Sequence, residues 1–287
     1  MSARAARIAA AFEWACLLEI EAPKPGNVHV FAAGHRMTAA EFARSAKAAA
    51  GPLSAPGRRV GARILDAVEA TFAAVGANTN LGILLLAAPL AAAAELATAD
   101  LRAALAQILK RLDVEDARFA FRAIVRAAPA GLGHSARHDV FAPAKVTLLQ
   151  AMVEAADRDR VARQYATDFA DVFDLGLPVF AAAVERKLAA KWAALATYLS
   201  FLAAFVDSHI VRKQGTSVAE DVRRKAAVLQ SSLQAAEHPA SLLNDILVWD
   251  AELKSAAINP GTSADLTVAT LFVDRLQTIL PSARNND

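Results

Sequence analysis

The stretch Ala62-Arg-Ile-Leu-Asp-Ala-Val-Glu-Ala-Thr-Phe-Ala-Ala74 decides the fold class of this 287-residue chain. It repeats apolar residues at three- and four-residue spacing, at Leu65, Val68 and Phe72, which is the pattern of a helix with one apolar face. Alanine, leucine and arginine, which all favour helices, recur along the whole chain, whereas β-branched residues are few. No stretch alternates convincingly enough to predict a strand. The sequence therefore predicts an all-α protein.

The same pattern extends in both directions and predicts about a dozen helices. Thr38, Asp100 and Ser263 suit N-cap positions, and Pro178 suits a first turn. No internal repeat, low-complexity linker or shift of composition divides the chain, so residues 1–287 are expected to form a single compact domain with functional interhelical loops. The expected helices are 3–19, 39–50, 62–74, 81–96, 101–111, 114–126, 145–156, 158–173, 178–207, 217–236, 241–256 and 263–279.

Charge and cysteine content argue against several classes of protein. The formal net charge is +2 and the basic residues are spread along the chain, so we expect no nucleic-acid partner. Cys16 is the only cysteine, which excludes an internal disulfide and a thiolate metal cluster. The uncharged stretches 70–94 and 192–206 are interrupted or too short to span a membrane, and the N-terminus lacks the apolar core of a signal peptide. We therefore expect a cytoplasmic protein without a membrane span.

Five polar loops separate the predicted helices, and functional residues concentrate on loops that a rigid scaffold holds. The first is Glu19-Ile-Glu21-Ala-Pro-Lys24-Pro-Gly26-Asn27, which places one lysine between two prolines. Proline cannot continue the helix, so the loop is stiff and we expect it to present Lys24 to an anion. The two carboxylates just upstream, Glu19 and Glu21, could hold a divalent metal beside it, and lysine plus metal suits a polyphosphate.

The second and third loops each allow two interpretations. Gly76-Ala-Asn78-Thr79-Asn80-Leu-Gly82 opens an apolar helix, and its glycines, amides and helix N-terminus suit a phosphate or the sugar and base of a nucleotide. It is not a Walker loop, and simple N-capping explains it as well. The third loop carries His134, Arg137, His138 and Asp139, whose spacing does not match a zinc signature. A metal site and a solvated loop both stay open there.

The fourth and fifth loops combine helix-end chemistry with charge. Asp207-Ser-His209-Ile-Val-Arg212-Lys213-Gln-Gly215 follows a long predicted helix, at whose negative end Asp207 would lie unfavourably. We therefore expect this loop to be functional. Asn259-Pro-Gly-Thr262-Ser263-Ala-Asp265 is good helix-start chemistry, and its hydroxyls and free amides also suit a phosphate.

Taken in order, these five loops resemble the triphosphoribosyl-dephospho-coenzyme A synthase family. The resemblance implies an all-helical transferase that takes ATP and 3′-dephospho-coenzyme A as small-molecule nucleotide substrates and releases adenine. The triphosphoribosyl group would move to a ribose hydroxyl, by substitution at an anomeric carbon. Such a reaction needs a triphosphate clamp, stabilisation of an oxocarbenium-like centre, and a base for the incoming hydroxyl. The matching elements are Glu19 with 23–28, 76–82, 131–133 with 139–140, 207–215, and 259–266.

The resemblance implies a role for each polar loop. Lys24, Arg212 and Lys213 would clamp the triphosphate, while Glu19 and Asp207, with Asp265 next, would bind Mg²⁺ or stabilise charge. His209, or less favourably His35, would be the base, because only histidine has an unperturbed pKa near neutrality. The predicted catalytic residues are therefore Glu19, Asp207 and His209. The predicted ATP- and phosphate-binding residues are Lys24, Gly26, Asn27, Asn78, Thr79, Asn80, Arg212, Lys213, Thr262 and Ser263, and the predicted metal ligands are Glu19, Asp207 and Asp265.

Several elements, including residues 156–165, look closer to a divergent branch of the family in archaea and methylotrophic bacteria. That likeness implies a link to tetrahydromethanopterin-type C1 metabolism and leaves the acceptor open. Two alternatives also stay open: another ATP-dependent transferase or ligase in that cofactor pathway, and a non-catalytic helical nucleotide-binding protein. Alanine-rich helices could pack as a homodimer, but no heptad seam argues for one.

Overall fold

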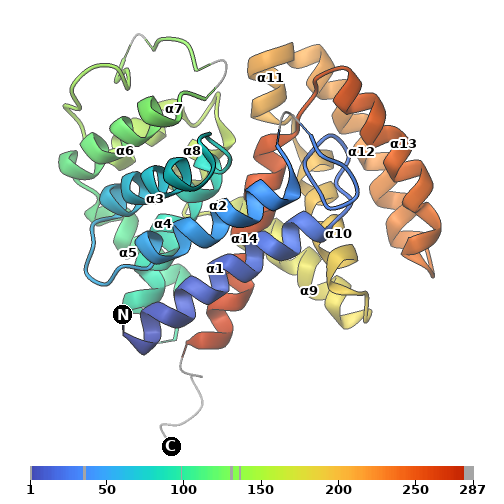
Figure 1. The fold of residues 1–287 in the computed structure, drawn as a ribbon, viewed down its shortest axis with the longest axis horizontal. Coiled ribbons are helices and arrows are strands. Elements are labelled where there is room, and N and C mark those ends of the chain that lie inside the picture. The colour runs from blue at the N-terminus through green and yellow to red at the C-terminus, as the bar shows by residue number, and fades with distance from the viewer. Residues whose placement is uncertain (1, 35–36, 98, 130–131, 136, 281–287) are drawn as a thin grey trace, which may run out of the picture.

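The computed structural model describes residues 2–34, 37–97, 99–129, 132–135 and 137–280 (Figure 1). Within these ranges it contains fourteen α-helices, one π-helical and one 3-10 segment, and two isolated β-bridges instead of strands, which confirms the all-α class. The α-helices are α1 (Ala3–Glu21), α2 (Ala39–Leu53), α3 (Val60–Val75), α4 (Leu81–Leu96), α5 (Leu101–Arg111), α6 (Val114–Ala127), α7 (Leu148–Ala155), α8 (Arg160–Ala166), α9 (Leu177–Glu185), α10 (Ala190–Ala204), α11 (Ser208–Gln214), α12 (Thr216–Ala235), α13 (Leu243–Ser255) and α14 (Gly261–Ile279).

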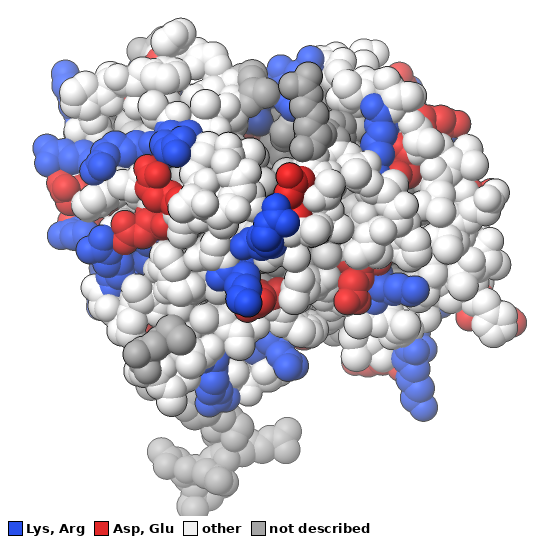
Figure 2. All heavy atoms as spheres, viewed as in Figure 1, with Lys and Arg blue, Asp and Glu red and all other residues white. Residues whose placement is uncertain are grey.

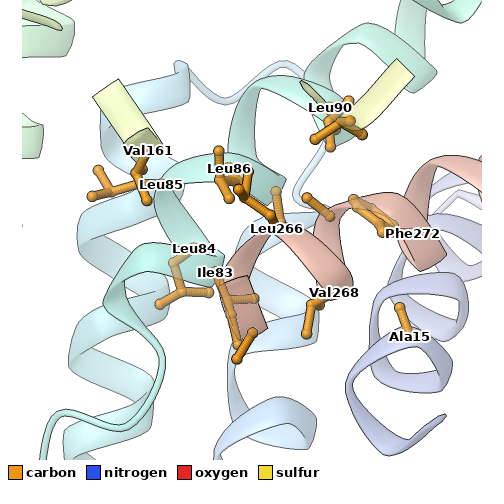
Figure 3. Packing of buried hydrophobic residues seen from close by; sticks show 14 of the residues in the cluster. Ala15, Ile83, Leu84, Leu85, Leu86, Leu90, Val161, Leu266, Val268 and Phe272 are labelled. Carbon is orange, nitrogen blue, oxygen red and sulfur yellow. The ribbon is translucent and has the colours of Figure 1, made fainter. Parts of the chain in front are cut away.

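Helices α4 and α14 form the centre of the core. Residues 83–94 of α4 are all buried, as expected for a helix that is apolar on every side. Figure 3 shows Leu86 of α4 close to Leu266 of α14, with Phe272 further along α14. Helix α14 also packs beside α1 and α10 (Figure 1), so the last helix of the chain joins the N-terminal and C-terminal halves. Each fully buried Leu or Phe stabilises the fold by about 1.5–3 kcal/mol relative to an exposed one.

Several of the expected helix boundaries differ from those in the structure, and one expected N-cap is wrong. The predicted helix 178–207 is interrupted where Lys187 adopts a left-handed φ of 58°, which separates α9 from α10. It then ends at Ala204, three residues before Asp207. The predicted helix 158–173 is broken where Asp168 and Phe169 have φ values of 49° and 59°, between α8 and the π-helical segment η1 (Asp171–Gly176). Helix α14 begins at Gly261, so Ser263 is not its N-cap.

The other expected capping residues are confirmed. The Thr38 side chain accepts a hydrogen bond from the backbone of Glu41, and Asp100 accepts one from Ala103. Pro178 lies in the first turn of α9. These local signals are readable because an N-cap bond involves residues only two or three positions apart.

Figure 2 shows basic and acidic side chains interspersed on one face of the molecule. Among the helices that the structure describes, none is by itself long and apolar enough to cross a bilayer. Two bent pairs, α4 with α5 and α10 with α11, reach that length and composition only when taken together.

Candidate active site

A cavity of about 820 Å³ lies where all five polar loops meet. Its walls come from the C-terminal end of α1, the N-terminal ends of α4 and α14, and from α6, α7, α8 and α11. Loops that are up to about 250 residues apart in sequence therefore face one space. The predicted site residues that line it are Glu19, Asn27, Asn78, Thr79, Asn80, His209, Arg212, Lys213, Thr262 and Asp265.

Four other predicted site residues lie behind the cavity wall, namely Lys24, Gly26, Asp207 and Ser263. Their contacts within the protein explain their positions. His35, the less favoured candidate base, lies outside the described residues.

Lys24 is fully buried, so the expectation that its loop presents it to an anion is wrong. Its Nζ donates to the backbone oxygens of Glu19 and Val28 at 2.9 and 2.8 Å, and lies 3.1 Å from Glu19 Oε1. An ammonium group has three donors, and these contacts use all of them. Burial lowers the pKa of Lys24, and the Glu19 carboxylate opposes that shift. Lys24 therefore fixes the loop and orients Glu19.

Glu19 turns its second carboxylate oxygen toward the cavity. Only 1% of this residue is exposed, and Oε2 is a buried oxygen without a hydrogen-bond partner among the described residues. Burial raises the pKa of Glu19, while the charge and hydrogen bond of Lys24 lower it. A buried acceptor left unpaired costs free energy unless a ligand satisfies it. Glu19 is therefore positioned to meet a substrate group or a cation.

Asp207 is the N-cap of α11, which corrects its expected place at a negative helix end. Its Oδ1 accepts from the backbone N–H groups of His209 and Ile210 at 2.9 and 3.2 Å. Its Oδ2 accepts from the backbone N–H and the hydroxyl of Ser263 at 2.8 and 2.9 Å. At a helix N-terminus a carboxylate is favourable. With four hydrogen bonds and no exposure, Asp207 joins α11 to α14 and does not face the cavity.

The fifth loop supports the first and the fourth. Thr262 Oγ1 lies 2.9 Å from the hydroxyl of Ser208 and accepts from the backbone of His209 at 3.2 Å. Gly26 has a φ of 79°, and a side chain there would meet Pro260 at 2.8 Å, so this close approach of the two loops requires glycine. Asn27 Nδ2 donates to Asn259 Oδ1 at 2.9 Å. Thr262 and Asn27 reach the cavity, whereas Gly26 and Ser263 hold the loops together.

The second loop uses one of its polar side chains as a cap and turns the others toward the cavity. Asn78 Oδ1 accepts from the backbone of Leu81 at 3.2 Å, as the capping interpretation predicts. Thr79 Oγ1 and Asn80 Nδ2 are buried without a partner among the described residues. Asn80 accepts only a long bond of 3.3 Å from Thr71. Capping alone therefore does not explain this loop, and its unpaired donors and acceptors suit a ribose or a phosphate.

Asp265 contributes a second unpaired carboxylate to the same end of the cavity. It receives no hydrogen bond within the part of the chain that the structure describes. Enclosure by the protein raises its pKa well above the usual range, and the neighbouring charges of Asp207 and Glu19 raise it further. Gly82 makes room for it, because an added side-chain carbon there would lie 2.0 Å from Asp265 Oδ2. Asp265 can therefore hold a proton at a higher pH than an ordinary aspartate.

The fourth loop brings cations and an imidazole to the cavity. Arg212 and Lys213 are exposed at its edge, and Arg212 Nη1 lies 3.4 Å from Asp159 Oδ2. Burial and the charge of Arg212 both lower the pKa of Lys213. The His209 ring packs against the backbone of Gly261, where a side chain would meet its Nδ1 at 2.7 Å. Arg212 and Lys213 are placed for an anionic ligand. The His209 imidazole and the carboxylates of Glu19 and Asp265 line the same cavity.

The third loop is organised by Asp139 rather than by a metal. Asp139 accepts from the backbones of Ser135 and Phe141 at 2.9 and 2.8 Å and lies 3.0 Å from His134 Nδ1. Within the described ranges no group of three or more His, Cys, Asp or Glu side chains could hold a metal ion. Neither the residues of this loop nor the predicted trio Glu19, Asp207 and Asp265 therefore forms a ready-made three-ligand site.

One buried cluster was not expected from the sequence. Asp250 Oδ2 on α13 lies 3.2 Å from His29 Nε2 and accepts from Lys254 at 2.8 Å, while its Oδ1 accepts from the backbone of Gly26 at 2.9 Å. These bonds hold the first loop against α13. Asp250 and Lys254 are four residues apart, which looks like an ordinary pair on a helix surface, so their burial could not be predicted from the sequence.

Comparison with known proteins agrees with this geometry. Residues 5–283 match the CitG family, described as ATP:dephospho-CoA triphosphoribosyl transferase. The chain belongs to this family. It is accordingly an ATP-dependent triphosphoribosyl transferase of the CitG type, which confirms the resemblance seen in the loops. No curated protein matches the chain.

The fold of this CitG-family chain also resembles a solved structure. A crystal structure from Archaeoglobus fulgidus, with triphosphoribosyl-dephospho-coA synthase as its provisional description, superposes with a TM-score of 0.61 at 22% identity. The match covers 80% of this chain and 95% of the other. At this identity the comparison supports the fold.

Proposed function

We propose that this CitG-family enzyme transfers the triphosphoribosyl group of ATP to a ribose hydroxyl of 3′-dephospho-coenzyme A or a related acceptor at the cavity described above. One observation carries the proposal. Glu19 and Asp265 both line a cavity whose edge carries Arg212 and Lys213, and Glu19 Oε2 is a buried oxygen without a partner among the described residues. Acids beside an anomeric carbon and cations for a triphosphate are the two groups that this reaction needs.

The cations and the second loop would hold the donor. Arg212 and Lys213 pair with the triphosphate oxygens, and Asn78, Thr79 and Asn80 contact the ribose or the phosphate nearest to it. Asn27 and Thr262 complete the wall on the opposite loops. Lys24 acts through Glu19 and does not touch the phosphates.

The two acids would divide the chemical step. The bond from C1′ to the adenine nitrogen breaks with its electron pair going to adenine, and the acceptor oxygen forms the new bond to C1′. Glu19 stabilises the positive charge that develops on the sugar. Asp265, which lines the cavity and whose pKa is raised by burial, takes the proton of the acceptor hydroxyl, and His209 on the same wall is the alternative base. The departing adenine takes up a proton, so charge and atoms balance.

A magnesium ion fits this donor set. Mg²⁺ is usually bound through one or two carboxylates together with substrate phosphates, so the absence of a three-ligand group among the described residues agrees with that mode. Glu19 Oε2 and the Asp265 carboxylate would hold it, and with the ion at Asp265 the proton of the acceptor hydroxyl would go to His209, the alternative base. When bound, the ion neutralises charge on the triphosphate.

The test is product analysis. The purified protein is incubated with ATP, Mg²⁺ and 3′-dephospho-coenzyme A, and nucleotides and bases are separated by chromatography. We expect free adenine and a product that retains all three phosphates. ADP or AMP would instead support an ATP-dependent ligase or another transferase, and no turnover at all would support a nucleotide-binding protein.

The identity of the acceptor, a link to tetrahydromethanopterin-type C1 metabolism, a cytoplasmic location and a homodimer remain proposals from the sequence. The acceptor has the most direct test, because alternative ribosyl acceptors can replace dephospho-coenzyme A in the same assay.

A further inference from the structure

The cavity has a second end that the proposed chemistry leaves unused. We call it the apolar compartment and define it by Leu85, Phe121, Ile124, Leu148, Met152 and Val161. These side chains come from α4, α6, α7 and α8, and α8 packs on both α7 and α4. Figure 3 shows Leu85 and Val161 side by side. The compartment is therefore lined by apolar side chains from four helices and belongs to the same cavity as the polar end.

Three buried polar atoms without a partner among the described residues belong to side chains that line the other end of the cavity. They are Glu19 Oε2, Thr79 Oγ1 and Asn80 Nδ2. The side chains that define the apolar compartment carry no nitrogen or oxygen. The hydroxyl of Tyr165 on α8 already donates to the backbone oxygen of Leu85. A ligand group enclosed here would find hydrocarbon and few hydrogen-bond partners.

This wall suits an alkyl chain better than a purine. Polar nitrogens surround the perimeter of adenine, so enclosure by hydrocarbon would leave several of them unpaired. The pantetheine arm of dephospho-coenzyme A alternates amides with methylene groups and carries two methyl groups on one carbon. Its hydrocarbon segments can face the compartment while its amides face the open side. Apolar surface removed from water in this way favours binding.

Two exposed arginines, Arg137 and Arg158, line the same cavity as the apolar compartment. Arg158 Nη1 donates to the backbone oxygen of Glu154 at 3.0 Å, and Arg137 Nη2 lies 3.3 Å from the Glu154 carboxylate. The acids nearby are Glu154, Asp139 and Asp159. Asp139 is occupied by loop N–H groups and Asp159 lies 3.4 Å from Arg212. A diphosphate joined to the arm could therefore meet Arg137 and Arg158 as the arm enters.

We propose that the apolar compartment binds the pantetheine arm of the acceptor, with its diphosphate at Arg137 and Arg158. The assignment rests on the proposed function, because it takes dephospho-coenzyme A as the acceptor. The cavity volume of about 820 Å³ is near the upper end of the range for a single ligand site, which leaves room for a second substrate beside ATP. The ATP ribose and the ribose hydroxyl of the acceptor then meet between the two ends of one cavity.

Adjacent residues of α7 provide a matched pair for the test. Met152 is 7% exposed and lines the compartment, whereas Val153 is 53% exposed on the outer face of the same helix. Dissociation constants of dephospho-coenzyme A and of ATP with Mg²⁺ are measured separately by calorimetry on the wild type, Met152→Glu and Val153→Glu. We expect Met152→Glu to weaken dephospho-coenzyme A at least about 10-fold and ATP less than about 2-fold. Val153→Glu should change neither.

Three results would overturn the assignment. The first is that the wild type does not bind dephospho-coenzyme A. The second is that Met152→Glu loses affinity for ATP alone, which would place the donor purine in the compartment. The third is that Met152→Glu weakens the binding of both ligands equally. If Met152→Glu fails to fold, Met152→Ala is measured instead, with an expected weakening for the acceptor alone. Binding is read without turnover. A protein that binds the acceptor as expected but releases no adenine would therefore contradict the proposed function and leave this assignment standing.

Discussion

Replacing Lys24 by methionine tests whether this lysine orients Glu19 or contacts the triphosphate. Methionine keeps the length and the apolar stem of the side chain but removes its charge and its donors. The change leaves the Glu19 carboxylate buried without a countercharge. It also removes the donor to the backbone oxygens of Glu19 and Val28.

The expected loss of stability follows from these contacts. Removing one partner of a buried ion pair costs about 3–5 kcal/mol, because the other charge stays buried and uncompensated. At roughly 2–4 °C per kcal/mol, Lys24→Met should melt about 6–20 °C below the wild type. The double variant Glu19→Gln/Lys24→Met should recover at least about 1–2 kcal/mol, since it no longer buries a charge. Lys225→Met breaks an exposed pair with Glu252 and should cost less than about 1 kcal/mol.

The penalty should also depend on pH. Burial raises the pKa of Glu19, and Lys24 opposes that shift, so the pKa rises further in Lys24→Met. A carboxyl group with a raised pKa holds a proton in the native state that the unfolded chain has lost. Stability then falls as the pH rises from the ordinary glutamate pKa through the raised one. Lys24→Met should therefore be less destabilised at about pH 5.5 than at about pH 8.

Thermal melts and ATP titrations of the same samples measure both properties. A Lys24→Met protein that melts at the same temperature as the wild type but has lost ATP affinity would contradict the structural role of Lys24, because a direct phosphate ligand behaves in that way.

Three further substitutions test other contacts of the site. Asp207→Ala should lose about 2–4 kcal/mol of stability in denaturant unfolding, because it removes the α11 cap and the link to Ser263. An unchanged unfolding midpoint would contradict that structural role. Asp265→Asn should lower the adenine-release rate at least about 100-fold. It should leave the ligand-free protein as stable or more stable at neutral pH, because a raised pKa means that ionisation of Asp265 costs stability above the ordinary aspartate pKa, and a large fall in melting temperature would be inconsistent. Gly82→Ala should displace the Asp265 carboxylate and reduce activity at least about 10-fold. The control Gly51→Ala should keep its activity, because an added side-chain carbon there has no neighbour within 4 Å. Equal activities of the two variants would show that the fit at Gly82 does not matter.

The sequence predicts the helices and the set of functional loops better than it predicts which loop residues face the cavity. Periodicity and local caps such as Thr38 and Asp100 involve residues close in sequence, so they can be read directly. The break before Asp207 could not, because the apolar pattern continues through Phe205 and Val206 although the helix ends at Ala204. Asp207 was consequently assigned to the wrong end of a helix.

Lys24 shows the same limit for a side chain. Two flanking prolines fix the backbone but do not determine whether the lysine points outward or inward. Its burial depends on carbonyls and a carboxylate that converge only in the folded loop. Asp265 and Asn80, in contrast, were expected at the site and do face the cavity. The prediction that residues 1–287 form one domain stays a prediction.

The most direct measurement of the central claim compares adenine release by Glu19→Gln and Glu21→Gln. Both residues lie near the end of α1, but Glu19 faces the cavity with an unpaired oxygen and Glu21 is exposed and does not line it. With ATP, Mg²⁺ and dephospho-coenzyme A, the account predicts that Glu19→Gln lowers the rate at least about 100-fold and that Glu21→Gln keeps it within about 2-fold of the wild type. Equal rates in the two variants would contradict the claim that this cavity carries out the transfer.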